Sequence, residues 1–458
     1  MQRSRTTAHF SVTQRSRFCG RPAKVRVKCG VTIRRRFNIS VLTYVAVLVC
    51  FTAPDRAGSQ SVSRREPPPL RAATLDQVLM FALRQNPDLL IAGTTVDSAR
   101  AEQRIAGALP NPSYVASPNT PYQYGASISL DVGPQRYFRT RASGLGVGAT
   151  RLDQRDALRQ LTLNVQRAFV DVLLSDTLEY LVRARYDVVR QVLASDSARF
   201  AAGDIPERNL FRTEGVLAHA QADLARAHVA VQTARLALQG LMGVANPDTG
   251  FTVVGDLHYT RGNPVATLGD SALLALALAH RPDLAAAAQR VLQSDVQRRL
   301  AASALIPIPQ LSYVRQFTVP FDGGHFYSFG LGVEVPILNF YSGQRARAAA
   351  GARAAEYAHD RASSQVTRDV VAAITAFRTQ RALVERFESD LLSKSDADVD
   401  ATRYAYSHGA ASLLDVLDSV KQQQDLRTDY FGALRDYWVS TFALSAAVGM
   451  ETISSVGA

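Results

Sequence analysis

Cysteine is almost missing from this sequence. The chain of 458 residues has three cysteines, Cys19, Cys29 and Cys50, and the rest of the chain has no thiol. A disulfide framework and a thiolate metal site are therefore excluded after residue 50, and the composition suits an oxidising compartment. Lipidation of Cys50 is disfavoured, because the bulky Val49 stands where such sites require a small residue.

Acidic residues are missing from the first 36 positions, which hold 11 of the 52 Lys and Arg residues. The remainder has 41 basic and 40 acidic residues, so the formal charge of +12 does not indicate a partner nucleic acid. Three arginines at 34–36 precede the apolar stretch 39–53. This order is typical of a secretory signal that is too short to span a membrane. We interpret residues 1–59 as a leader with a signal peptide, with Val31 as an alternative start, and residues 60–73 as a proline-rich linker.

Proline is missing from residues 135–205 and from the whole chain after Pro336. Since an interior proline breaks a helix, both stretches are free to form long helices, and the first would reach roughly 100 Å at about 1.5 Å per residue. A compact domain has no use for that length. Apolar residues in the first stretch alternate at spacings of three and four, which predicts a narrow buried seam: Leu158, Leu161, Val165, Ala168 and Val172.

The body of the chain is an internal repeat of one unit. Residues 79–89 match residues 274–284, and both segments end a short helix before a Pro-Asp-Leu sequence. The two units end at matching glycines, Gly243 and Gly449, which lie 206 positions apart. The repeat divides the body into four segments: a first repeat at 74–243, a linker at 244–268, a second repeat at 269–449 and a short tail at 450–458.

Each repeat also contains a stretch with strand periodicity. Residues 126–132 and 331–335 alternate between apolar and polar or small residues. We expect a β-hairpin at about 112–132 and another at about 309–335, each followed by a long helical hairpin, at 135–243 and 339–449. Four strands cannot close a sheet on themselves, so the sequence points to oligomerisation.

No enzyme motif is found. The glycine-rich segments 144–148 and 330–332 lack the strand-to-helix spacing of a phosphate-binding loop. The eight histidines are scattered, and His219 and His228 are too far apart for adjacent helical turns. We expect no catalysis, no cofactor and no metal site.

Four motifs occur in a fixed order within this duplication: Asn86-Pro-Asp-Leu89, Ala202-Gly-Asp-Ile205, Arg281-Pro-Asp-Leu284, and the segment from Tyr406 to Asp418. Over residues 74–449 the chain resembles the outer membrane efflux protein family, the TolC-like exit ducts of Gram-negative bacteria. The resemblance implies a fold that is mainly α with a membrane β-barrel. Three copies would pool four β-strands per protomer into a trimeric 12-stranded barrel in the outer membrane, continued by an α-helical periplasmic tunnel.

Partners and membrane contacts follow from the same resemblance. It implies a homotrimer that works with a periplasmic adaptor, or membrane fusion, protein and an inner-membrane pump. Aromatic strand residues would lie at the interface with outer membrane lipid, although they could equally pack a soluble hairpin. These residues are Tyr114, Tyr122, Tyr124, Tyr313, Phe317, Phe326 and Tyr327.

The tips of the long hairpins carry the implied site, an aperture where the tunnel narrows. Asp415 and Asp418 match two acidic positions of the family, and three-fold symmetry would turn them into rings of charge that favour cations. From the residues alone, both could equally offset the dipole of a helix start. The turns at Gly203, Asp204, Gly409 and Ser412 would contact the adaptor.

The gate of the aperture departs from the family pattern. Tyr406 is kept, but the gate arginine aligns with Ala411 and its aspartate partner aligns with Asn209. We therefore expect the closed state to be held less tightly, unless Arg208 or Arg212 substitutes for the missing pair.

The sequence thus predicts the outer membrane exit duct of a tripartite efflux system. One alternative is a periplasmic helical-hairpin adaptor, or another partner-binding protein without a pore. A second is the exit duct of a type I protein secretion system. The substrate stays open between drugs, metal cations and proteins.

Overall fold

The computed structural model describes residues 72–117, 122–259, 268–317, 325–408 and 410–450. They all belong to the second of two compact units, Pro68–Ala458. The expected signal peptide, the alternative start, Cys50 and most of the 60–73 linker and the 450–458 tail lie outside the described residues.

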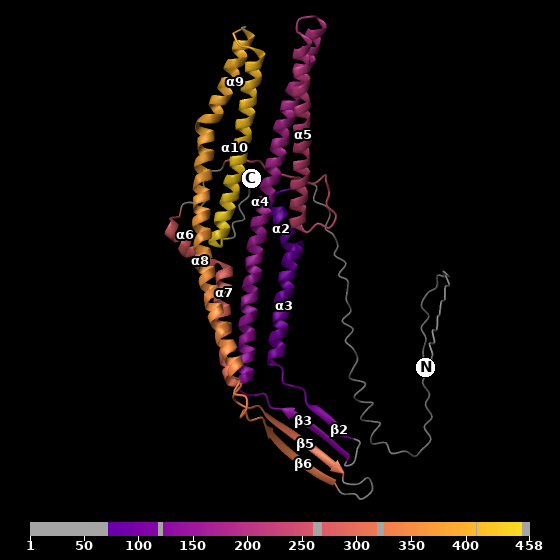
Figure 1. Ribbon diagram of the computed structural model, residues 1–458, viewed down its shortest axis with the longest axis vertical. Coiled ribbons are helices and arrows are strands. Elements are labelled where there is room, and N and C mark those ends of the chain that lie inside the picture. Colours follow the sequence, from indigo (N-terminus) through magenta and orange to yellow (C-terminus); the bar gives the residue numbers. More distant parts are fainter. Residues whose placement is uncertain (1–71, 118–121, 260–267, 318–324, 409, 451–458) are drawn as a thin grey trace, which may run out of the picture. The chain divides into compact units, whose positions relative to one another are not determined.

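The two halves of this unit have the same order of elements (Figure 1). The first half contains α2 Leu75–Gln85, α3 Pro87–Gly107, β2 Ser113–Ser117, β3 Tyr122–Ser129, α4 Pro134–Ala201 and α5 Glu207–Met242. The second half contains α6 Asp270–His280, α7 Pro282–Ser303, β5 Pro309–Phe317, β6 His325–Val333, α8 Ser342–Arg386, α9 Leu392–Ser407 and α10 Leu413–Val448.

The Pro-Asp-Leu motifs separate two helices in each half. Asn86 ends α2 and caps α3, because its Oδ1 accepts from the backbone N–H groups of Asp88 (2.9 Å) and Leu89 (3.2 Å). Its Nδ2 also donates to the carbonyl of Leu241, at 2.8 Å. In the second half Arg281 takes this place and is buried, with its guanidinium 2.6 Å from Asp283 and 2.9 Å from Asp369.

Helix α4 is the 68-residue helix to which much of the fold is attached. It packs against α2, α3, α5, α7 and α10. Because five helices pack against it, residues 161–173 bury more than the expected narrow seam. Phe169, Val170 and Leu173 are buried beside Leu161, Val165 and Val172, so the prediction of a narrow stripe is wrong there.

The second proline-free stretch does not form one continuous helix. A π-helical turn, Phe387–Leu391, separates α8 from α9. At this turn Phe387 is buried and its ring lies 6.0 Å from that of Tyr430, whose hydroxyl donates to Glu388 at 2.9 Å. The extra residue of a π turn rotates the following side chains, and proline placement gives no signal for it.

The four long strands form one antiparallel sheet in the order β2-β3-β5-β6. Two strands end earlier than expected, at Ser129 instead of residue 132 and at Val333 instead of residue 335. After β3 the backbone turns, because Val132 N–H donates to Leu130 O at 2.9 Å. The Asp131 carboxylate is then buried against Arg139, at 2.6 Å. A second, parallel pairing of β1 Ala72–Ala73 with β4 Thr252–Val253 was not predicted.

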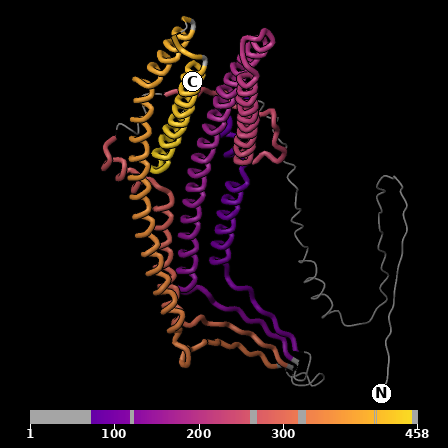
Figure 2. The backbone as a smooth tube through the Cα atoms, turned by 45° about the horizontal axis from the view of Figure 1, so that its top comes forward, coloured from indigo at the N-terminus to yellow at the C-terminus, as the bar shows by residue number. Residues whose placement is uncertain are grey.

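The sheet lies at one end of the long helices, and the tips of both helical hairpins lie at the other (Figures 1 and 2). The core lies between these ends, where α2 and α6 pack against the long helices. None of the described helices combines the length and the hydropathy that crossing a membrane requires.

The same glycine contact closes both repeats. Gly243 (φ 76°) and Gly449 (φ 80°) end α5 and α10 in the left-handed conformation. A Cβ on Gly243 would lie 2.6 Å from the Gln85 carbonyl oxygen, and one on Gly449 would lie 3.2 Å from the His280 carbonyl carbon. The chain therefore needs glycine there for two reasons, backbone conformation and close approach.

We expect Gly243→Ala to lower the thermal unfolding temperature more than Gly203→Ala does. Gly203 also has a positive φ of 81°, but a Cβ there would meet nothing within 4 Å. Gly203→Ala should cost about 1–2 kcal/mol from backbone conformation alone, whereas Gly243→Ala adds a backbone clash. Circular dichroism of the detergent-purified variants measures both, and equal shifts would contradict the close approach.

Candidate functional site

The first hairpin tip is a tight turn between α4 and α5. Gly203 N–H donates to Phe200 O at 2.9 Å, and Asp204 N–H donates to Arg199 O at 2.8 Å, which completes the end of α4. Both residues are exposed. The structure thus places the two expected contact residues of this tip in the turn itself.

At the second tip, Ser412 and Asp415 form a reciprocal cap at the start of α10. Ser412 Oγ accepts from the Asp415 N–H at 3.2 Å, and Asp415 Oδ2 accepts from the Ser412 N–H at 2.8 Å. The backbone hydrogen bond from Ser412, followed by that of its hydroxyl, lowers the pKa of Asp415. Capping is therefore a real role of Asp415, and its carboxylate stays exposed at the tip. Gly409 lies outside the described residues.

Asp418 lies one turn further along α10 and is also exposed. Its Oδ2 accepts a hydrogen bond from Gln422 at 3.0 Å. Asp415 and Asp418 thus share the tip of one helix, the place where symmetry-related copies could form rings. That role remains a prediction.

The gate residues are divided between the two tips. Tyr406 lies in the last turn of α9 and Ala411 lies in the connection that follows it, whereas Asn209, Arg208 and Arg212 lie in the first two turns of α5. Within the part of the chain that the structure describes, neither Arg208 nor Arg212 forms an ion pair, so a replacement for the gate's charged pair is not seen inside one protomer.

A groove of about 270 Å³ joins the two tips. Asn209 and Arg212 line it from the first hairpin, and Leu414 and Leu417 line it from the second. Asp196 of α4 also lines it and is only 6% exposed, and its Oδ2 accepts the Thr213 hydroxyl at 2.7 Å. Tyr406, Ala411, Asp415 and Asp418 are not among the lining residues.

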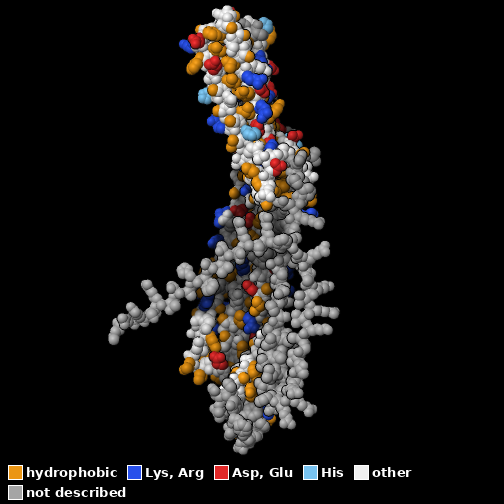
Figure 3. Space-filling model, turned by 90° about the vertical axis from the view of Figure 1, so that its right-hand side faces the viewer, with side chains coloured by type: hydrophobic (Ala, Val, Ile, Leu, Met, Phe, Trp, Pro, Cys, Tyr) orange, Lys and Arg blue, Asp and Glu red, His pale blue; other side chains and the backbone are white. Residues whose placement is uncertain are grey.

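The sequence reading missed Asp196, although a signal was present. Val189, Val192 and Asp196 recur at i, i+3 and i+7 of one helix face, so the carboxylate had to share an apolar face. The face of the hairpin end seen in Figure 3 carries hydrophobic, basic and acidic side chains intermixed.

The four-stranded sheet has two different faces. The pairing register puts mainly apolar and aromatic residues on one face, and Phe329 (78%) and Leu331 (68%) are strongly exposed there. Among the described side chains of this face, Arg315 is the charged one, and its guanidinium carbon lies 5.4 Å from the Tyr327 ring centre. The described apolar-face residues are Tyr114, Ala116, Tyr124, Ala126, Ile128, Pro309, Leu311, Tyr313, Arg315, Tyr327, Phe329, Leu331 and Val333.

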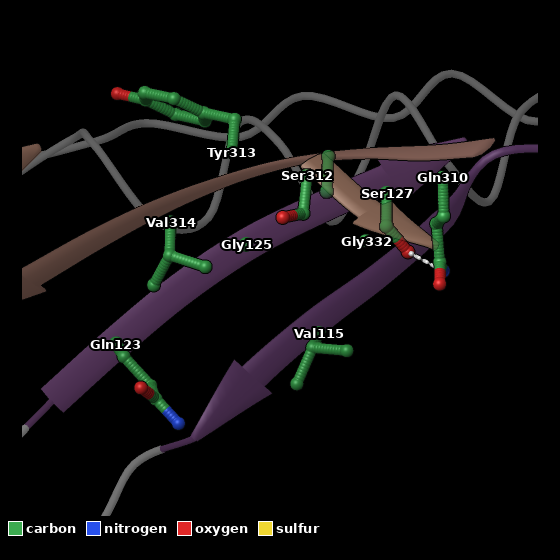
Figure 4. A pocket seen from close by; sticks show the side chains of 10 residues that line it. Val115, Gln123, Gly125, Ser127, Gln310, Ser312, Tyr313, Val314 and Gly332 are labelled. Carbon is green, nitrogen blue, oxygen red and sulfur yellow. Dashed lines mark hydrogen bonds between the residues drawn. The ribbon is translucent and has the colours of Figure 1, made fainter. Parts of the chain in front are cut away.

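The opposite face is polar and contains small residues. It has a hollow of about 280 Å³ between β2, β3, β5 and β6, across which Gln310 donates to Ser127 Oγ at 3.1 Å (Figure 4). Tyr313 points away from this hollow. Most described residues of this face are polar or small, and three are apolar: Ser113, Val115, Ser117, Gln123, Gly125, Ser127, Ser129, Gln310, Ser312, Val314, Gln316, Phe326, Ser328, Gly330 and Gly332.

The expected aromatic set falls mostly on one face. Tyr114, Tyr124, Tyr313 and Tyr327 share the apolar face, whereas Phe326 lies on the polar one, so grouping Phe326 with them was wrong. The side chains of Tyr122 and Phe317 lie outside the described residues. Over the described residues, no group of three or more His, Cys, Asp or Glu side chains is placed to hold a metal ion.

Comparison with known proteins agrees with this architecture. Residues 273–450 match the family model for outer membrane efflux proteins. The match covers most of the second half of the chain. The first half repeats its order of elements, so the resemblance stated from the sequence motifs is confirmed.

Other known proteins are similar to this chain over most of its length. The cobalt-zinc-cadmium resistance protein CzcC of Cupriavidus metallidurans is 24% identical over 434 residues, which are 88% of this chain and 98% of that protein. The CmeC outer membrane channel of Campylobacter jejuni superposes with a TM-score of 0.71 at 16% identity, covering 82% of this chain and 85% of that one. The open state of the MtrE channel of Neisseria gonorrhoeae gives 0.67 at 19%, covering 82% and 89%.

We expect Ser412→Ala to expose the start of α10. Amide hydrogen exchange at residues 413–416 should rise about fivefold, because the cap is lost. The part of this change that comes from the hydrogen bond of the Ser412 hydroxyl to the Asp415 carboxylate should be present above the ordinary pKa of an aspartate and fade as pH falls through the lowered pKa of Asp415. Ser197→Ala is the control, since that exposed serine donates only to Leu193 O within α4. Unchanged exchange in the Ser412 variant would contradict the cap.

Proposed function

We propose that three copies of this chain form the outer membrane exit duct of a tripartite efflux system. The duct passes substrate from the periplasm and an inner-membrane pump to the exterior. The observation that carries this proposal is the two-faced sheet, which exposes an apolar face in a single chain while its other face is polar. A protein that stays in the periplasm without a pore has no use for such a sheet.

The open edges of the sheet support assembly. β2 and β6 form its two edges, and in lipid an unpaired strand edge would leave backbone groups without partners. Pairing β6 of one copy with β2 of the next satisfies them, and three copies give twelve strands. The apolar face then meets lipid, and the polar face lines a water-filled passage.

The packing of the helices within one copy can also repeat from one copy to the next around the ring. Within one copy α3 packs on α4, α4 on α7, and α7 on α8, so α3 and α8 are the ends of the series. Since α3–α4 and α7–α8 are the same unit repeated, the α4–α7 contact predicts how α8 meets α3 of the next copy. The exposed outer residues of α3, among them Ile91 and Ile105, are then covered by the neighbouring copy.

Charge selection in this duct belongs to the hairpin tips. The described side chains of the polar sheet face carry no charge, so this part of the passage does not discriminate by charge. Rings of Asp415 and Asp418 at the tips would favour cations. The tip turns, with Gly203, Asp204 and Ser412, would contact the adaptor.

The similarity to CzcC favours divalent metal cations as the cargo. A passive duct needs no metal site of its own, and selection would belong to the pump. The direct test is to delete the gene, restore it, and compare growth in cobalt, zinc and cadmium salts. Equal growth of both strains would remove this cargo and leave the duct itself standing.

We expect Phe329→Lys to prevent assembly of the duct in the membrane. A lysine facing the middle of a bilayer costs about 2–4 kcal/mol in each copy. Ser328→Lys is the matched control, because the neighbouring residue lies on the polar face. Fractionation and trimer yield measure the effect. Equal yields from both variants would contradict the assignment of the two faces.

Conductance tests the function and the aperture together. The purified protein should have the mass of a trimer and form an ohmic pore in a planar bilayer.

Asp415→Asn with Asp418→Asn should reduce the cation preference, measured as the reversal potential across a salt gradient. Asp97→Asn is the control, since that exposed aspartate pairs with Arg100 on α3, far along the chain from the tips. A soluble monomer without conductance would refute the duct, and an unchanged reversal potential would refute only the rings.

A further inference from the structure

Two elbows connect the sheet to the long helices. The first, residues 130–133, joins β3 to α4, and the second, residues 334–341, joins β6 to α8. The second elbow exposes large apolar side chains, with Leu338 at 95%, Ile337 at 72% and Phe340 at 61%. An exposed apolar cluster of this kind marks a surface that meets another apolar phase or a partner.

The second elbow is folded on itself. Ile337 N–H donates to Val335 O and Tyr341 N–H donates to Asn339 Oδ1, both at 2.9 Å. Tyr341 adopts a left-handed conformation (φ 53°), and its carbonyl accepts from Arg345 N–H at 3.0 Å to begin α8. The apolar side chains are therefore presented outward by a defined turn.

The first elbow lies between two helices of the same chain, so it shows how exposed the second elbow would be between helices of two copies. Leu338 lies 206 positions after Val132, the same offset that relates Arg345 to Arg139 and Gly449 to Gly243. Arg136 donates to Gly107 O at the end of α3, and Gln135 donates to Ile306 O after α7, both at 2.6 Å. Although the ends of α3 and α7 lie on the two sides of the first elbow, Val132 is still 74% exposed.

The exposure of Val132 distinguishes between two possible covers of the elbows, a second copy of the chain and a surface outside the protein ring. If a second copy of the chain covered the elbows, the first elbow would already be covered by the helix ends on its two sides. Because Val132 stays exposed between α3 and α7, the equivalent Leu338 would stay exposed between α7 and α3 of the next copy. The surface that covers both elbows must come from outside the protein ring.

Charge around the elbows fits a phospholipid surface. Arg345 and Arg347 are exposed directly after the second elbow, and Arg141 after the first donates to the Tyr137 hydroxyl at 2.7 Å. Of the nearby acids, Asp131 is paired with Arg139, and Glu334 is exposed. Arginine and tyrosine beside apolar side chains are the residues that settle between acyl chains and phosphate groups.

We propose that both elbows bind the phospholipid surface of the inner leaflet, with Leu338 and Val132 inserted at the level of the headgroups. The proposal rests on the proposed function, because it extends the apolar stripe of Phe329, Leu331 and Val333 to the periplasmic edge of the sheet. A protein with three copies then has six such contacts. They hold the duct at a fixed depth while the helices extend into the periplasm.

Spin labelling tests this proposal in the full-length protein. With Cys19, Cys29 and Cys50 changed to serine, single cysteines at Leu338 and at Val132 are labelled with a nitroxide in trimers reconstituted in phosphatidylethanolamine and phosphatidylglycerol vesicles. Phe329→Cys is the reference for the membrane. Phe211→Cys is the reference for water, because Phe211 lies on α5 and is 75% exposed.

We expect the ratio of oxygen to nickel-chelate collisions at Leu338 and Val132 to be several-fold above that at Phe211. A water-like ratio at Leu338 beside a lipid-like ratio at Phe329 would overturn the inference and leave the duct standing. Low collision rates with both reagents at Leu338 would also overturn it, since a second copy would then cover the elbow. A water-like ratio at Phe329 itself would refute the proposed function.

Discussion

The pairing requirement of strand edges is the constraint on which the rest of this structure depends. A sheet of four strands with one apolar face is not stable alone in lipid, because its two edges offer backbone groups that lipid cannot satisfy. The duplicated unit pairs one edge of each hairpin within the chain, since it places the two hairpins side by side in one sheet. In the proposed duct the remaining edges pair with further copies, and the long helices then have to fit a ring whose size the strands set.

Within that constraint the two repeats differ where their surroundings differ. Asn86 ties the start of α3 to the end of α5, whereas Arg281 reaches two carboxylates, on α7 and α8. Burial alone would raise the pKa of Asp283, but the hydrogen bonds and charge of Arg281 outweigh it and lower that pKa. The elbow of the second repeat is longer than that of the first, and only the second hairpin has a π-helical turn among the described helices.

Much of this fold could be predicted from the sequence because proline and glycine mark its boundaries. The break before Pro87 and the turn at Gly203 follow from local backbone chemistry and were found where expected. The strand ends were misplaced, because alternation continues through Val132 while a buried ion pair of Asp131 turns the backbone. The π turn at Phe387 depends on packing against Tyr430, 43 residues later, and no local pattern shows such a contact.

The hairpin tips show why a site is harder to predict than a fold. Asp415 is both a capping residue and an exposed charge, so one pattern predicted two roles and the structure supports capping without excluding the other. The sequence resemblance aligns the family's charged gate pair with Asn209 and Ala411, and the groove between the hairpins is lined in part by Val189, Leu414 and Leu417. Contacts between apolar side chains weaken little with added salt, whereas exposed ion pairs are screened. The Asp196–Thr213 hydrogen bond joins α4 to α5 within the first hairpin, and apolar side chains of both hairpins meet in the groove beside it. We therefore expect added salt to change the contact between the two tips little.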